Sequence, residues 1–166
     1  RYGEDAIPIR PGEGPEALEL LNTSFEDQPL LDGAPGVTSN PLGNFTTTAP
    51  SDWTITGGSG GLFAPVDSVS STAGHPRPNV AWLTGGATLS QDSGTLTEGA
   101  SYQLSLSVGD RTDQVWSGGT ARLVAVGAGG VTTVISSVTL PEPADGQWAD
   151  LTLNSGPISA GLAGQT

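Results

Sequence analysis

The amino-acid sequence predicts an all-β domain, an antiparallel jelly-roll β-sandwich with an extended N-terminal arm. Three observations predict this class. The 166 residues include 25 Gly and 13 Pro, which favours many turns over long helices. From Leu18 onward, short apolar runs alternate with turn residues, as in sandwiches and barrels. The length suits one sandwich and is too short for a comfortable second domain.

The first 17 residues differ from the rest in composition. They are rich in Pro, Gly and acidic residues, which disfavour a helix and bury little surface. One interpretation of this segment is a flexible linker. The alternative is an assembly arm that docks on a neighbour, because Ile7, Pro8 and Ile9 suit an extended segment along a sheet edge. We therefore divide the chain into an arm, 1–17, and a sandwich body, 18–166.

Eight segments of the body have the composition of strands. Alternation is clearest from Tyr102 to Val108, where one face is apolar and the other carries Ser and Gln. This pattern is typical of a strand with one face in the core and one in water. The predicted strands are 18–26, 53–57, 79–84, 87–91, 102–108, 120–127, 131–140 and 148–153.

Glycine-rich segments separate these predicted strands. The pairs at 118–119 and 129–130 are predicted to be hairpin turns. The glycine run at 57–61 is predicted to be a loop, and the long segment 27–52 a crossing connection. The body is therefore expected to be built from antiparallel strands with short turns and one long loop.

The charge of the chain is strongly negative, at −12, and the sequence contains no Lys. Such a chain repels phosphate backbones and anionic lipid, so we expect neither nucleic-acid binding nor membrane insertion. The sequence has no run of about 18 apolar residues. It also lacks Cys, which excludes disulfides and thiolate metal sites. The composition suits a salty exterior, and we expect a secreted protein or one at the cell surface.

Several segments carry a resemblance to a known family. The stretch from Asn22 to Glu26 resembles the opening strand of galactose-binding-like jelly rolls, the architecture of many carbohydrate-binding modules. The later segments that follow in the same order are Trp53-Thr54, 86–91, 102–109, 121–123 and 148–153. The resemblance covers residues 20–166 and implies a non-catalytic extracellular module for adhesion or carbohydrate binding, whose partner is a glycan or cell-surface polysaccharide.

The same resemblance implies a structural Ca²⁺ near the first strand. Glu26 would be its carboxylate ligand and backbone carbonyls would supply other oxygens, in keeping with the six to eight that Ca²⁺ prefers. The family's second carboxylate lies in a final strand, and this sequence stops at Thr166 before that strand.

A sandwich without its closing strand leaves an open sheet edge. Truncation, a disordered tail and donation of a strand by another subunit each explain such an edge. In the last case residues 1–17 are the donor, and the protein is a structural subunit of an extracellular filament or virion appendage that binds copies of itself.

Trp116, Asp110 and Asp113 are the candidate ligand-binding residues. Sugars pack their C–H faces on aromatic rings and bond through their hydroxyls to carboxylates. Trp116 follows an acidic loop rather than an alternating strand, which favours a binding role. The alternatives are a Trp that packs over the end of the sandwich and a solvated acidic loop. The carboxylates of Asp110 and Asp113 also suit Ca²⁺.

Motifs for catalysis are weak in this sequence. Residues 57–61 match the G-x-S-x-G pattern, but Pro65 follows where a nucleophile elbow needs a helix, and His75 is the sole histidine. The turn at Asp92 resembles that of aspartic proteases, which need two such carboxylates, and no second copy is present. A phosphate-binding P-loop requires Lys. We therefore predict a protein that is not an enzyme.

Overall fold

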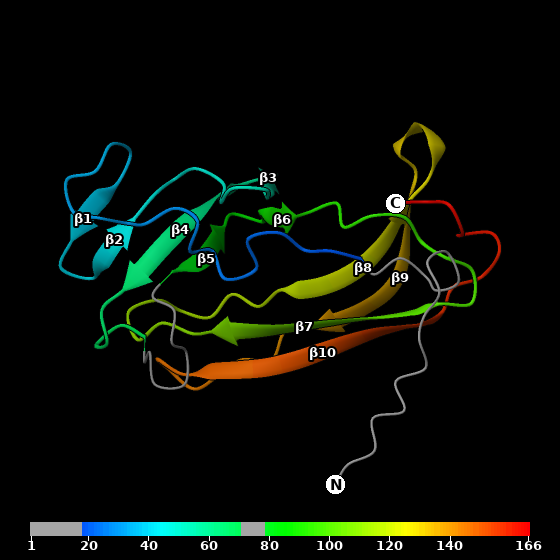
Figure 1. Cartoon of the computed structure of the whole chain (residues 1–166). Coiled ribbons are helices and arrows are strands. Elements are labelled where there is room, and N and C mark those ends of the chain that lie inside the picture. The colour runs from blue at the N-terminus through cyan, green and yellow to red at the C-terminus, as the bar shows by residue number, and fades with distance from the viewer. Residues whose placement is uncertain (1–17, 71–78) are drawn as a thin grey trace, which may run out of the picture.

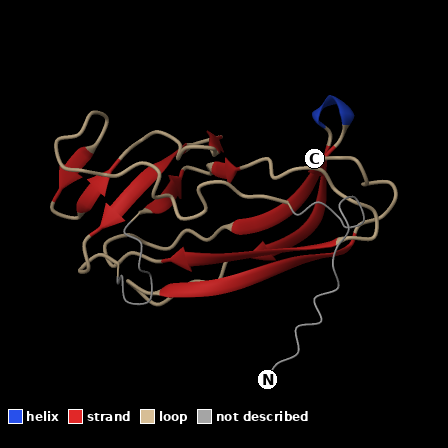
Figure 2. Cartoon of the chain, in the orientation of Figure 1, coloured by secondary structure: helices blue, strands red, loops and turns tan. Residues whose placement is uncertain are grey.

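The structure, a computed structural model, describes residues 18–70 and 79–166, and these residues form an all-β fold (Figures 1 and 2). The predicted all-β class is confirmed. Within the described ranges the sole helix is a short 3₁₀ turn, η1 (Ala128–Gly130). The strands in chain order are β1 (Thr38–Asn40), β2 (Gly43–Phe45), β3 (Thr54–Thr56), β4 (Ser59–Pro65), β5 (Val80–Thr84), β6 (Thr88–Ser90), β7 (Ser101–Gly109), β8 (Thr120–Val126), β9 (Thr132–Thr139) and β10 (Trp148–Pro157).

All strand pairs are antiparallel. One sheet has the order β1-β2-β4-β5, and three further pairs are β3-β6, β7-β10 and β8-β9. Figure 1 places β1 to β6 along one side of the molecule and β7 to β10 along the other. The ladder between β7 and β10 starts where Trp148 lies opposite Gly109, and it ends where Pro157 lies opposite Ser101. This ladder confirms the strand that the alternation from Tyr102 to Val108 predicts.

The predicted strand at 18–26 is wrong, because this segment forms turns. Asn22 and Phe25 have φ values of 44° and 60°, in the left-handed region that extended strands do not use. Trp53 holds the turn in place: its Nε1 donates to the carbonyls of Leu21 (3.1 Å) and Asn22 (3.3 Å). The ring of Phe25 also packs at 5.6 Å from that of Trp53. Side-chain contacts therefore override the extended pattern of the sequence.

The predicted loop at 57–61 is partly wrong, since Ser59, Gly60 and Gly61 open strand β4. A Cβ at Gly61 would lie 2.1 Å from the carbonyl oxygen of Thr46, and one at Gly60 would lie 2.7 Å from that of Trp82. Only glycine allows these strands to approach so closely. The predicted crossing connection at 27–52 also contains β1 and β2, which are short and mostly polar.

The turn at residues 129–130 joins β8 to β9 and confirms the hairpin predicted there. The pair at 118–119 instead precedes β8, at the open end of the same hairpin, where Leu140 N donates to the Gly119 carbonyl at 3.0 Å. At the other end, Val126 N donates to the Thr166 carbonyl at 2.6 Å, so the C-terminal segment lies beside β8.

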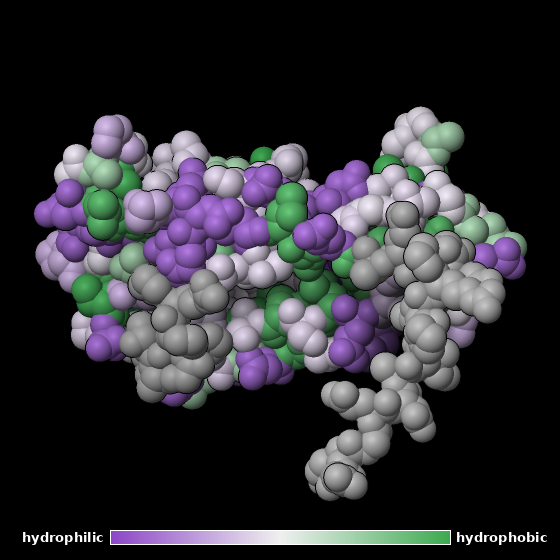
Figure 3. Space-filling model, in the orientation of Figure 1, coloured by the Kyte–Doolittle hydropathy of each residue, from purple (hydrophilic) through white to green (hydrophobic). Residues whose placement is uncertain are grey.

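The buried core gathers under β7, β8 and the C-terminal segment. Leu96, Ala125 and Ile158 are each at most 5% exposed and pack together, while Leu62 and Leu153 are buried elsewhere in the fold. On the face drawn in Figure 3, hydrophobic residues gather near the middle of the molecule, and hydrophilic residues flank them. Burial of these side chains supplies the main stabilisation of the fold.

Candidate functional site

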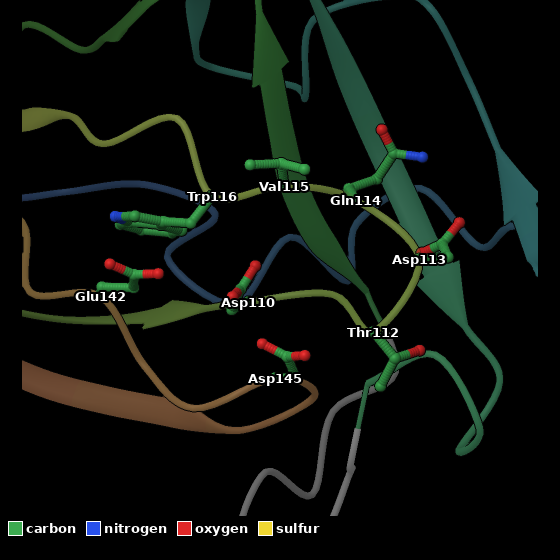
Figure 4. Close-up of a pocket in the computed structure, with 8 residues that line it drawn as sticks. All are labelled: Asp110, Thr112, Asp113, Gln114, Val115, Trp116, Glu142 and Asp145. Carbon is green, nitrogen blue, oxygen red and sulfur yellow. The ribbon is translucent and has the colours of Figure 1, made fainter.

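A pocket of about 390 Å³ lies at the end of the β7–β10 ladder. Two loops build it, the one that follows β7 and the one that precedes β10, because the antiparallel register brings Gly109 opposite Trp148. The residues that line it, all drawn in Figure 4, are Asp110, Thr112, Asp113, Gln114, Val115, Trp116, Glu142 and Asp145. The three residues that the sequence singles out as ligand-binding therefore lie in the lining of one pocket.

Asp110 is the buried carboxylate of this pocket, at 5% exposure. The β7–β10 ladder sets its position, since its backbone N donates to the Gln147 carbonyl at 3.0 Å. The ring of Trp148 covers Gly109, where a Cβ would lie 2.9 Å from two ring atoms. The Asp110 carboxylate accepts a hydrogen bond from the backbone N of Arg111 at 2.8 Å. Because residue 109 is a glycine, the indole of Trp148 packs on the backbone there, and the Asp110 carboxylate reaches the pocket.

Asp113 is paired with Arg111. Nε and one terminal nitrogen of the guanidinium donate to the two carboxylate oxygens at 2.9 and 2.8 Å. These hydrogen bonds are the main cause of a pKa of Asp113 below its ordinary value; partial burial opposes the shift, and the charge of Arg111 adds to it. Asp113 is therefore an ionised carboxylate already matched by a cation.

Trp116 and Val115 supply the apolar part of the pocket. Trp116 is half-buried, and Figure 4 shows its ring close to Glu142 and above Asp110. Val115 is 93% exposed, an unusual state for an aliphatic residue beside an aromatic ring. An indole and an uncovered aliphatic side chain form a surface on which a flat organic molecule packs well.

Sequence reasoning missed Glu142 and Asp145, which come from the loop before β10. Both are exposed, and Figure 4 shows Glu142 below the ring of Trp116 and Asp145 below Asp110. The signal was available: an antiparallel partner of β7 must begin where β7 ends, so the acidic loop before β10 meets the loop after β7. With Asp110 these carboxylates make the pocket strongly acidic, while the nearby Arg111 is neutralised by Asp113.

Glu26 lies in the turn after the N-terminal segment and not in this pocket. Its Oε1 accepts from the backbone N of Asn79 at 2.9 Å. The Asn79 side-chain amide, in turn, donates to the carbonyls of Phe25 and Gln28, both at 3.0 Å. Three oxygens thus gather around Asn79, and within residues 18–70 and 79–166 no three His, Asp or Glu side chains cluster as metal ligands do. The metal role of Glu26 stays a prediction.

A second hollow, of about 400 Å³, lies on the outer face of the β7–β10 ladder, beside Ser105, Ser107, Asp150 and Thr152. Its polar side chains pair with one another across the ladder. Ser105 and Thr152 hydroxyls are 3.2 Å apart, and the Ser107 hydroxyl donates to the Asp150 carboxylate. This hollow offers a ligand few groups that are not already engaged.

Two predictions fall outside the residues that the structure describes. The assembly arm of Ile7, Pro8 and Ile9 belongs to residues 1–17, and His75 belongs to residues 71–78. In the remaining part of the chain, no helix has both the length and the apolar character that a membrane span requires.

Solved structures of two cyclases share the fold. One is the apo form of a cyclase from Fischerella sp., with a TM-score of 0.67 and 15% identity, covering 91% of this chain and 84% of that one. The other is the Stig cyclase Fisc from Fischerella sp. TAU in complex with (3Z)-3-(1-methyl-2-pyrrolidinylidene)-3H-indole, with a TM-score of 0.66, 15% identity and coverage of 92% and 85%. No curated protein matches the chain.

A family model described as HpiC1 cyclase, HpiC1-like, matches residues 16–165. This match corrects several predictions. The resemblance to galactose-binding-like carbohydrate-binding modules is wrong, because the family model that matches almost the whole sandwich body is that of a cyclase. The predicted adhesive module and filament subunit, their glycan partner, and the absence of an enzyme are wrong for the same reason, because the matched family is one of cyclases, which are enzymes. The chain belongs to the HpiC1-like cyclase family.

Proposed function

We propose that this protein catalyses ring closure of a small organic molecule, an uncharged or cationic nitrogen heterocycle, in the pocket beside Trp116. The family supports a cyclase, and the neighbour Fisc binds an indole derivative. The observation that carries the assignment to this pocket is the buried Asp110 carboxylate beside the exposed apolar surface of Trp116 and Val115.

The chemistry of ring closure suits such a pocket. In an acid-initiated cyclisation, a proton adds to one carbon of a double bond, a second π bond attacks the resulting cation to form the ring, and a base removes a proton. Atoms balance, since one proton enters and one leaves. We assign the delivery of the proton to the buried carboxyl group of Asp110, and its removal to Glu142 or Asp145.

The same pocket stabilises the cation formed between these steps. An indole face attracts positive charge, and so do carboxylates that surround it in a partly dehydrated site. Trp116 therefore serves both to bind a flat substrate and to face its developing charge. An anionic substrate is disfavoured, because the carboxylates of Glu142 and Asp145 repel it.

The test is turnover of alkenyl indoles by the purified protein. Ring closure without loss of atoms gives a product of unchanged mass, so we expect a new chromatographic peak with the mass of the substrate and a ring visible by NMR. Heat-denatured protein is the control. If the wild type is active and the Trp116→Ala variant is equally active, the reaction takes place elsewhere in the molecule. If the wild type converts neither neutral nor basic indoles, the proposal is overturned.

We also propose that Glu26 is a ligand of a Ca²⁺ ion that has a structural rather than a catalytic role. The Glu26 carboxylate and the carbonyls of Phe25 and Gln28 supply three oxygens of the six to eight that Ca²⁺ prefers, so further ligands are needed. Thermal unfolding with added CaCl₂ tests this: the midpoint rises for the wild type and not for Glu26→Gln. Equal midpoints with and without Ca²⁺ would contradict it.

Two further features stay proposals. The arrangement of β1 to β6 against β7 to β10 supports a jelly-roll sandwich as the finer description of the fold. The strongly acidic charge, at −12, supports a protein that works in the salty medium outside the cell.

A further inference from the structure

We infer that Arg111 is a positioning residue, which holds the loop of residues 110–116 in the shape that forms the pocket. This role of Arg111 rests on the proposed function, because the loop that it holds forms the proposed active site. Arg111 does not itself line the pocket, and its guanidinium makes two different contacts.

The first contact folds the loop on itself. The guanidinium donates two hydrogen bonds to the Asp113 carboxylate, at 2.9 and 2.8 Å, and so closes a turn around Thr112. A planar guanidinium matches a carboxylate in this two-bond geometry, which fixes direction as well as distance. The turn directs Gln114 and Val115, the next residues along the chain, into the pocket wall.

The second contact ties the turn to a different sheet. The guanidinium carbon of Arg111 lies 4.6 Å from the centre of the Phe63 ring, a cation–π contact with strand β4. Phe63 is itself 4% exposed and so is a fixed support. Thr112 adds two bonds to the segment after β4, from its backbone N to the Val69 carbonyl and from its hydroxyl to the Ser68 carbonyl, both at 3.0 Å.

These contacts fix the conformation of the loop and add little to the free energy of unfolding of the whole fold. The Arg111 and Asp113 side chains are 31% and 26% exposed, and exposed ion pairs contribute little to the free energy of unfolding. The same pair nevertheless selects one loop conformation, in which Val115 stays 93% exposed instead of turning toward the core. A Lys at position 111 would keep the charge and lose both the paired hydrogen bonds and the planar stacking.

Hydrogen–deuterium exchange of the full chain tests the inference without a ligand. In Arg111→Lys and Arg111→Ala we expect the amide of Thr112, which donates to the Val69 carbonyl, to exchange roughly tenfold faster, with β7 and β10 unchanged. Arg122→Ala, an exposed arginine on β8, is the matched control and leaves the loop unchanged. Phe63→Leu, which keeps the core filled, gives a smaller increase.

Binding and turnover show whether the loop matters to the site. The probe is (3Z)-3-(1-methyl-2-pyrrolidinylidene)-3H-indole, the compound held by the neighbour Fisc. We expect Arg111→Lys to weaken its binding several-fold, and to raise KM for an alkenyl indole while kcat stays within about twofold, since Arg111 touches no reacting atom.

Different results would count against the positioning role of Arg111 and against the proposed cyclase activity. Unchanged loop exchange in Arg111→Lys would overturn the positioning role, as would faster exchange spread over all strands. Faster loop exchange with unchanged probe affinity and KM would also overturn it. A wild-type protein that neither binds the probe nor converts any indole would remove the proposed function, and the exchange data would still decide whether Arg111 holds the loop.

Discussion

The two hollows on the β7–β10 ladder have nearly equal volumes, about 390 and 400 Å³, and opposite chemical characters. In the outer hollow, Ser105 pairs with Thr152 and Ser107 with Asp150, so the polar groups satisfy one another. At the end of the ladder, a half-buried indole and an exposed valine lie beside carboxylates from two loops. Exposed apolar side chains beside carboxylates therefore mark a ligand site better than the volume of a hollow does.

The largest difference between the two hollows is expected in the rate of product formation of Asp110→Asn. The amide cannot deliver a proton, so product formation should fall roughly a hundredfold, the usual contribution of a general acid. Asp150→Asn changes a carboxylate of the outer hollow in the same way and should leave the rate within about twofold. Rates of product formation measure both, and equal losses in the two variants would erase the contrast.

The next effect concerns the backbone under Asp110. In Gly109→Ala the new Cβ would lie 2.9 Å from the Trp148 ring, so the ring must move, at a cost of about 1–3 kcal/mol in the free energy of unfolding. Gly161→Ala is the control, because a Cβ there meets nothing within 4 Å. Urea denaturation of both variants checks this, and a Gly109→Ala protein as stable as the control would show that the indole is not packed on the backbone.

A smaller effect is expected from loss of the indole itself. Trp116→Ala should weaken binding of the indole probe about tenfold, since aromatic pairs contribute up to roughly 1.5 kcal/mol beyond area burial. The outer hollow offers the comparison: Ser105→Ala should leave the affinity unchanged. Isothermal titration measures both constants. If Ser105→Ala weakens binding more than Trp116→Ala does, the ligand occupies the outer hollow.

The smallest effect is the dependence of the loop on pH. Arg111 lowers the pKa of Asp113 in the folded state, so the pair stabilises the fold fully above the unfolded pKa, about 3.9, and loses this contribution as the pH falls through the lower folded value. The stability difference between wild type and Asp113→Asn should therefore be constant near neutral pH and shrink below about pH 4. A difference that grows in acid would contradict the pairing.

Where apolar and polar side chains alternate regularly, the sequence predicts the strand well. The segment from Tyr102 to Val108 is a strand in the structure, because period-two burial leaves it no other stable arrangement. The sequence also singles out Asp110, Asp113 and Trp116, and the structure places all three in the lining of one pocket, while their binding role stays a prediction. The turn at 18–26 was missed because its shape depends on Trp53, about thirty residues away.

By itself the sequence determines the all-β class, the strongly acidic charge and the residue types available to the site, since these follow from composition and local periodicity. Only the tertiary structure decides that Glu142 and Asp145 join Asp110 in one pocket, and that Arg111 reaches Phe63. The physical reason is that antiparallel register and side-chain packing act between residues far apart in the chain, which no local pattern records.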